Sequence, residues 1–460
     1  MNEKTVWESY TEEDKKKVYD FCEEYRTFLS KCKTERECVK EILKEAEAKG
    51  YRSLKEVRRS GEKLQAGDKV YVSIMGKTLA LFHIGKEPME KGMNILGAHI
   101  DSPRLDLKQN PLYESDGLAM LETHYYGGIK KYQWVAMPLA LHGVVAKKDG
   151  TSVEIALGED PSDPVIGISD LLPHLAAQQN ERKLKDGIKG EELNIIVGSL
   201  PYPCEEEDSI KEPVKLLALS ILNERFGMTE KDFLRAEIEF VPAVKATDVG
   251  LDRSLVGAYG QDDKVCAYTA LTAEMKAKSP EYTTVTILAD KEEIGSVGNT
   301  GLNSDFTLHY IEGLCKAGNV DVRKVLKHSL CLSADVNAAY DPTFASVFEE
   351  KNSCYLNKGV VLTKYTGARG KSGSNDASAE TMAKVIQIMD EAGVYWQIGE
   401  LGAVDVGGGG TVAKYVANQD IDTIDIGVPV LSMHSPFEIV SKADVYMAYL
   451  TFKAFCEDAE

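Results

Sequence analysis

Four apolar runs, far apart in this chain of 460 residues, each lead to residues that bind metals or transfer protons. In open α/β sheets, ligands bind outside the carboxyl ends of parallel strands, so we expect the four ends to meet in one crevice. The fold is therefore predicted to be α/β, with a mixed central sheet flanked by helices. The runs and the residues that follow them are 94–97 with His99 and Asp101, 284–288 with Glu292 and Glu293, 330–333 with Asp335, and 428–432 with His434.

The pair Glu292 and Glu293 is the most specific of these endings. Adjacent carboxylates at the end of a buried strand repel each other and lose hydration, so they require a cation. One of the two can bind a metal while its neighbour remains free as a general base, as metal-assisted hydrolysis requires. A solvated acidic turn is the alternative for this pair alone, and the recurrence of similar strand ends favours the metal site.

A fifth contributor is Asp262, in QDDKVCAYTALTAE, where carboxylates open a predicted amphipathic helix. The collected set then holds two histidines and several carboxylates, with no cysteine near them. Such ligands suit zinc, cobalt or manganese, and they argue against an iron-sulfur cluster or a Cys-rich structural zinc site.

Composition narrows the classes of partner. A formal net charge of -19 disfavours nucleic acid and anionic membranes, because both repel an acidic surface. Nine cysteines without a CxxC pair indicate reduced thiols and a cytoplasmic protein. The amino-terminal segment is too polar for a signal peptide, and no run approaches the roughly 18 apolar residues of a membrane span.

The order of predicted elements indicates a catalytic domain interrupted by an insertion. Helices are expected over 12–49, strands over 69–74, 78–84 and 93–100, and a final helix over 442–456. Short β-branched and aromatic segments after Asp106 indicate a β-rich module, followed by a helix-like stretch over 168–185. We place the first part of the catalytic domain at 1–107, the inserted domain at 108–243, and the second part at 244–460.

Three other motifs carry less weight. GARGKS at 367–372 resembles the end of a phosphate-binding loop, but Tyr365 stands where that loop requires glycine. The run GGGG at 407–410 lacks the third glycine of a dinucleotide fingerprint. Gly408 and Gly409 fit better as residues that let the backbone approach a substrate, or as part of a tight turn. The absence of GxSxG argues against a serine hydrolase.

Five ordered motifs resemble the M18 family of dinuclear zinc aminopeptidases, whose best-known members are aspartyl aminopeptidases. The motifs are GAHIDSPRLDLK, QDDK, DKEEIGS, SADVN and MHSPFE, with the β-rich insertion between the first two. The resemblance covers nearly the whole chain. It implies a zinc-peptidase-like catalytic domain, an inserted oligomerisation domain, peptide substrates, and two Zn²⁺ per chain, for which Co²⁺ or Mn²⁺ can substitute.

The resemblance also implies a role for each candidate residue. Asp262 resembles the carboxylate that bridges the two metals, and Glu292 resembles the catalytic base. Asp101 resembles the carboxylate that orients His99, a role that a metal-bound imidazole generally needs. Asp263 departs from the Asn often found there in the family. The remaining metal ligands implied are His99, Glu293, Asp335 and His434.

His174, in ISDLLPHLAAQQNER, resembles a family histidine that reaches the active site of a neighbouring subunit. This implies an active homo-oligomer, which in the family is commonly a tetrahedral dodecamer, built here from dimers. A helix-capping or partner-facing histidine next to Pro173 is the alternative.

Substrate preference stays open at this point. Lys364 and Arg369 are available to bind an acidic side chain, so the enzyme either prefers acidic amino-terminal residues or acts broadly on neutral ones. Two other classes are a dinuclear amidase acting on non-peptide amides and a catalytically silent oligomeric scaffold. Retention of Glu292 and all five ligands argues against the scaffold, which has no need of buried carboxylates.

Overall fold

The computed structural model describes residues 4–203, 210–278 and 280–458. The chain forms two compact units, and each is described by itself. The first comprises Met1–Ser102, Ala246–Met433 and Phe437–Glu460, and the second comprises Pro103–Lys245 with the short segment His434–Pro436. Within the described ranges, no helix is long and apolar enough to cross a membrane.

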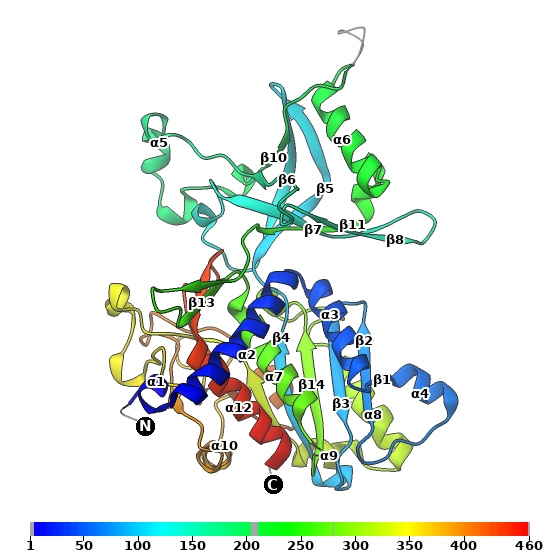
Figure 1. Ribbon diagram of the computed structural model, residues 1–460, viewed down its shortest axis with the longest axis vertical. Coiled ribbons are helices and arrows are strands. Elements are labelled where there is room, and N and C mark those ends of the chain that lie inside the picture. The colour runs from blue at the N-terminus through cyan, green and yellow to red at the C-terminus, as the bar shows by residue number, and fades with distance from the viewer. Residues whose placement is uncertain (1–3, 204–209, 279, 459–460) are drawn as a thin grey trace. The chain divides into compact units, whose positions relative to one another are not determined.

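The first unit is built on a nine-stranded mixed sheet (Figure 1). Its centre is parallel, because β4 pairs in parallel with both β14 and β15, and β15 pairs in parallel with β19. Antiparallel strands flank this centre, with β3 beside β14 and β17 beside β19. In spatial order the strands are β1 (Arg52–Ser53), β2 (Lys69–Ile74), β3 (Thr78–His83), β14 (Thr283–Ala289), β4 (Met93–His99), β15 (Leu330–Ala334), β19 (Asp422–Gly427), β17 (Val360–Thr363) and β18 (Trp396–Ile398).

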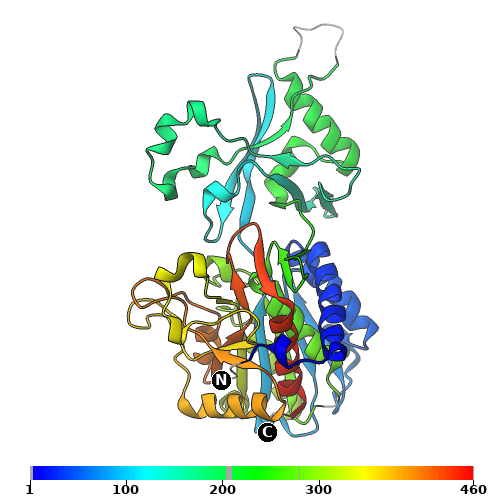
Figure 2. The same cartoon turned by 60° about the vertical axis from the view of Figure 1, so that its left-hand side comes forward.

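Helices cover both faces of this sheet, so the predicted mixed α/β architecture is confirmed (Figures 1 and 2). One apolar core lies under α2 (Glu12–Lys31), α3 (Glu35–Ala48), α7 (Gln261–Lys276), α10 (Ala379–Glu391) and α12 (Lys442–Asp458). The other lies under α4 (Leu54–Ser60), α8 (Phe306–Gly318), α9 (Val322–His328) and α11 (Ala413–Ala417). A short helix, α1 (Val6–Ser9), precedes α2.

The helix α7 departs from the amphipathic pattern that we expected. Nearly all its residues from Gln261 to Met275 are buried, on every side of the helix. It packs against α2 and α12 as well as β4 and β14, so neighbours surround it. A helix enclosed in this way has no solvent face, and the expected polar stripe is missing.

A smaller five-stranded sheet also belongs to the first unit. Its strands in spatial order are β12 (Thr247–Val249), β13 (Leu255–Ala258), β21 (Glu438–Ser441), β20 (Pro429–Leu431) and β16 (Asn337–Ala338). The antiparallel pair β20 and β21 is joined by the segment that contains His434. The small sheet therefore continues directly from β15 and β19 through short connections, since β16 follows β15 and β20 follows β19.

The second unit is a seven-stranded antiparallel sheet with α6 (Pro213–Phe226) packed along it (Figure 2). β11 pairs with both β5 and β7, so the sheet closes on itself. The stretch 168–185, expected to be helical, contains only single turns and the four-residue α5 (Ala177–Asn180), because Pro173 interrupts it. The strands are β11 (Ala236–Pro242), β5 (Arg104–Ser115), β6 (Leu118–Tyr126), β10 (Ile195–Gly198), β9 (Ile166–Gly167), β7 (Pro138–Ala146) and β8 (Ser152–Leu157).

Candidate metal centre

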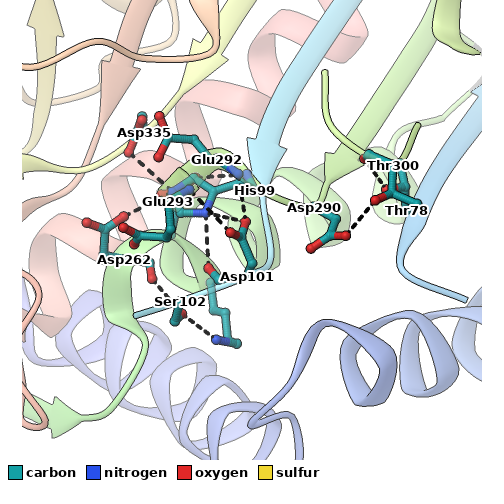
Figure 3. Close-up of polar contacts among 12 residues, drawn as sticks. Thr78, His99, Asp101, Ser102, Asp262, Asp290, Glu292, Glu293, Thr300 and Asp335 are labelled. Carbon is teal, nitrogen blue, oxygen red and sulfur yellow. Dashed lines mark hydrogen bonds and ion pairs between the residues drawn. The ribbon is translucent and has the colours of Figure 1, made fainter. Parts of the chain in front are cut away.

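The central strands bring their carboxyl ends together at one edge of the nine-stranded sheet. The alignment of β14 with β4 places Ala289 beside His99, so the loop with Glu292 and Glu293 starts next to that imidazole. The alignment of β15 with β4 places Ser333 beside Gly97, so Asp335 and His99 each follow two residues later. Figure 3 shows the carboxylates of Asp335 and both glutamates gathered around the His99 ring.

One group of potential metal ligands consists of His99, Asp262 and Asp335. Their ligand atoms all lie within 4.8 Å of one another. His99 Nε2 is 3.1 Å from Asp262 Oδ1 and 3.9 Å from Asp335 Oδ1. His99 and Asp262 are buried, with 1% and 4% of their surface exposed, so water does little to hydrate these charges.

A second group shares one member with the first. The ligand atoms of Asp262, Glu293 and His434 also lie within 4.8 Å of one another. Asp262 therefore belongs to both groups, as a carboxylate that bridges two ions would. His434 adopts a positive φ of 64°, and its Nδ1 lies 2.8 Å from the Gly128 carbonyl oxygen. A hydrogen bond to that carbonyl orients the imidazole ring.

The electrostatics of the site call for cations. Burial and the charge of Asp263 raise the pKa of Asp335 well above its usual range. Burial also raises the pKa of Asp263, with Asp262 adding to the rise and His99 opposing it. Burial alone would lower the pKa of His99, but hydrogen bonds to Asp101 and Asp262 raise it well above the usual value. A divalent metal ion near these groups would favour their charged forms.

Asp101 connects the histidine to the glutamate loop. Its Oδ1 lies 3.3 Å from His99 Nδ1 and accepts the backbone N–H of Glu292 at 3.1 Å. Its Oδ2 accepts the N–H of Glu293 at 3.2 Å. One buried carboxylate thus contacts the histidine ring and the two residues of the loop at the same time. Its orienting role stays a prediction.

Two residues that had no predicted role contact the backbone of Asp262, and Lys264 bonds to one of them. Ser102 Oγ donates to the Asp262 carbonyl oxygen at 2.8 Å, and Lys264 Nζ donates to Ser102 Oγ at 2.6 Å. Glu438 Oε2 accepts the Asp262 N–H at 3.1 Å. Ser102 and Glu438 stand inside the motifs GAHIDSPRLDLK and MHSPFE, but nothing in their spacing identifies Asp262 as their common partner.

The donor set fits zinc. Both groups combine imidazole nitrogen with carboxylate oxygen, and neither contains a cysteine. The buried Asp263 Oδ1 has no hydrogen-bond partner among the described residues, so the region carries more acceptors than the protein satisfies. Asp262 is the one member that the two groups share.

Comparison with known proteins shows the family of this chain. The chain matches the family model "Aminopeptidase I zinc metalloprotease (M18)" over residues 28–456. It belongs to the M18 family. A "Probable M18 family aminopeptidase 1" of Clostridium acetobutylicum is 53% identical over 98% of this chain and 97% of the relative.

Solved structures of the M18 family share the fold. The crystal structure of aminopeptidase I from Clostridium acetobutylicum is 49% identical and has a TM-score of 0.94, with all of both chains covered. The M18 aminopeptidase of Thermotoga maritima is 45% identical and also has a TM-score of 0.94, over 99% of each chain. The S. cerevisiae mApe1 dodecamer is 23% identical over 95% of this chain and 96% of that one, with a TM-score of 0.77.

The residues expected to bind substrate also lie in the first unit. Gly408 lines a cavity of about 250 Å³, together with Tyr365, Arg369 and Lys371. Gly409 accepts a hydrogen bond from the Gly367 N–H. Lys364 Nζ donates to Asp376 Oδ1 at 2.7 Å and to the Ala377 carbonyl at 2.8 Å. Their contact with substrate stays a prediction.

His174 lies in the second unit, in the single turn Pro173–Leu175. Three leucines around it are exposed, with 51% of Leu171, 49% of Leu172 and 68% of Leu175 accessible to solvent. Apolar side chains gathered on a surface are typical of a contact with another protein. The action of His174 in a neighbouring subunit stays a prediction.

Proposed function

We propose that this M18 protein removes amino-terminal residues from peptides with two zinc ions, bridged by Asp262. The observation that carries this proposal is the membership of Asp262 in both ligand groups. In the proposal His99 and Asp335 complete one site, and Glu293 and His434 complete the other. When bound, the ions supply a nucleophilic water near neutral pH and polarise the scissile carbonyl.

In this proposal Glu292 is the general base. Its neighbour Glu293 is committed to a ligand group, while Glu292 is half-buried and belongs to neither group. The Glu292 carboxylate takes a proton from the attacking water and delivers it to the leaving amine. Asp101 keeps the backbone of both glutamates in place and fixes the tautomer of His99.

Metal stoichiometry tests the two-ion proposal. Protein dialysed against a zinc buffer should retain two ions per chain by elemental analysis, and Asp262→Asn should weaken both. A wild-type chain that holds at most one tight ion, even with added metal, would contradict the proposal.

The role of Glu292 has its own test. Glu292→Gln should keep both ions and lose activity by roughly 100-fold or more. If the kcat of Glu292→Gln lies within a few-fold of the wild-type value, another group is the base.

We also propose a preference for acidic amino-terminal residues. Lys364 is supported by its position next to Tyr365, which lines the cavity. The charged residues of that lining are Arg369, Lys371, Glu400 and Asp405, so two cations there are available to bind an acidic side chain. Aspartyl, glutamyl, leucyl and alanyl p-nitroanilides would be compared, with Lys364→Met as the variant. The preference requires a higher kcat/KM on the acidic pair and a selective loss of that advantage in Lys364→Met. Equal rates on all four substrates would favour the broad, neutral-residue alternative.

Two further parts of the proposal concern assembly and location. The exposed leucines around His174 and the dodecameric yeast relative support a homo-oligomer, with a dodecamer as the proposed assembly. The cysteines within the described ranges are free and buried thiols, which supports a cytoplasmic location. Sedimentation velocity would test the assembly, and a monomer at assay concentration would contradict it.

A further inference from the structure

The loop that carries Glu292 and Glu293 is closed at its base by a reciprocal pair of hydrogen bonds (Figure 3). The backbone N–H of Asp290 donates to the Thr300 carbonyl oxygen at 3.3 Å. In return the Thr300 hydroxyl donates to Asp290 Oδ2 at 2.6 Å. The nine intervening residues, 291–299, include both glutamates, so these two hydrogen bonds hold the two ends of the loop together.

A second strand fixes this closure from outside the loop. The hydroxyl of Thr78, the first residue of β3, donates to the same Thr300 carbonyl at 2.6 Å. Asp290 and Thr300 are each 1% exposed, and Thr78 is 0% exposed. Since water does not reach these groups, a hydrogen bond lost here is not replaced by solvent.

The loop needs such an anchor because of its backbone. Lys291 has a φ of 67° and Ser296 a φ of 56°, values that residues with side chains adopt at a cost. Asp101 accepts hydrogen bonds from the loop at Glu292 and Glu293, near its start. With the base released, two unfavourable conformations favour relaxation of the loop, and the glutamate side chains would move with it.

We propose that Thr300 is a positioning residue for the metal centre, which acts through its hydrogen bonds to Asp290 and Thr78. It belongs to neither ligand group and contacts the chemistry only through the loop. This inference rests on the proposed roles of Glu292 and Glu293. Loss of the anchor lowers metal affinity and kcat, because the ligand and the base are displaced, and it leaves KM nearly unchanged.

The chain offers a matched control. Thr286 lies in β14, four residues before Asp290, and is 0% exposed. Its hydroxyl has no hydrogen-bond partner within the described part of the chain. Thr300→Val and Thr286→Val make the same chemical change at buried positions, but only the first removes an anchoring bond. Thr78→Val removes the bond from β3 and serves as a second test if Thr300→Val folds poorly.

The experiment compares zinc affinity, kcat and KM for full-length Thr300→Val, Thr78→Val, Thr300→Ser and Thr286→Val. Zinc affinity is measured by competition with a chelator on protein whose fold is checked by circular dichroism. We expect Thr300→Val and Thr78→Val to lose roughly 10-fold to 100-fold in zinc affinity or kcat, as for other residues that orient metal ligands. Thr300→Ser keeps the hydroxyl and should stay near wild type, as should Thr286→Val.

Two outcomes overturn the inference. One is that Thr300→Val and Thr78→Val match Thr286→Val in zinc affinity and kcat. The other is that Thr300→Ser is as impaired as Thr300→Val, since a packing role of the methyl group would then explain the loss. Glu292→Gln, assayed in parallel, separates this failure from failure of the proposed function. An active Glu292→Gln refutes the assigned base, whereas an inactive one with fully active threonine variants refutes only the anchor.

Discussion

Replacement of Asp101 by asparagine gives a quantitative test of how the metal centre is organised. The carboxylate serves three donors, with His99 and the Glu292 N–H on Oδ1 and the Glu293 N–H on Oδ2. An amide has a single acceptor oxygen. If that oxygen takes the place of Oδ1, the amide NH₂ faces the Glu293 N–H, and a partly buried donor is left without an acceptor.

Such an unsatisfied donor costs about 1–3 kcal/mol. Since about 1.4 kcal/mol corresponds to a factor of ten, the cost is equivalent to roughly a 5-fold to 150-fold change if it falls on the metal-bound form. We therefore expect Asp101→Asn to weaken zinc binding, and with it kcat/KM at limiting zinc, by a factor within that range.

The assay is a zinc titration against a competing chelator, followed by kinetics at each level of free zinc. Asp444→Asn is the matched control, because Asp444 is also fully buried and accepts two backbone N–H groups, from Asn357 and Gly359, both at 2.7 Å. Neither partner belongs to a ligand group. Equal zinc affinity in Asp101→Asn and Asp444→Asn would refute the reasoning, since Asp101 would then be only a buried structural carboxylate.

Two further predictions concern pH and assembly. Burial and the charge of Lys69 lower the pKa of His83 to about 4. Between pH 6.5 and about pH 4 the His83 imidazole binds a proton in the unfolded chain but not in the folded one. The free energy of unfolding should therefore fall by about 2 kcal/mol by pH 5, and His83→Gln should not show this loss. Urea unfolding at pH 7.5 and 5.0 measures this, with exposed His309→Gln as control, and equal pH dependence in wild type and His83→Gln would contradict it. Mixing Glu292→Gln with His174→Ala under subunit exchange should restore part of the activity, and no recovery at any ratio would place both residues in one chain's site.

Sequence patterns predicted the strands of the first unit well, because each is a run of buried apolar residues with a clear end. The expected strand 69–74 coincides with β2, and the expected strand 78–84 differs from β3 by one residue. The convergence of His99 and Asp335 required one more assumption, that the strands are parallel neighbours. The parallel pairing of β4 with β15 confirms this assumption. Because Gly97 is aligned with Ser333, His99 and Asp335 each follow two residues after an aligned pair, at the same edge of the sheet.

Contacts between distant residues were not predictable in the same way. Thr78 and Thr300 are 222 residues apart, and Ser102 and Asp262 are 160 apart. A single threonine or serine has no periodicity to indicate its partner, and its hydroxyl is satisfied in many environments. The burial of α7 on every side was missed for a related reason. It depends on contacts with α2 and α12, and the sequence of α7 alone does not indicate where those helices lie.

The four glycines at 407–410 show where a sequence pattern permits two explanations and the structure supplies one of them. Gly408 has a φ of 121°, and a Cβ there would lie 2.3 Å from the Gly367 carbonyl oxygen and 2.7 Å from Ala368 Cα. Backbone packing between these two segments is therefore sufficient to require glycine, whether or not a substrate also approaches. A loss of activity in Gly408→Ala would consequently follow from this clash alone. Lys364 is the better probe of substrate binding, because its charge can be removed without a change in the backbone.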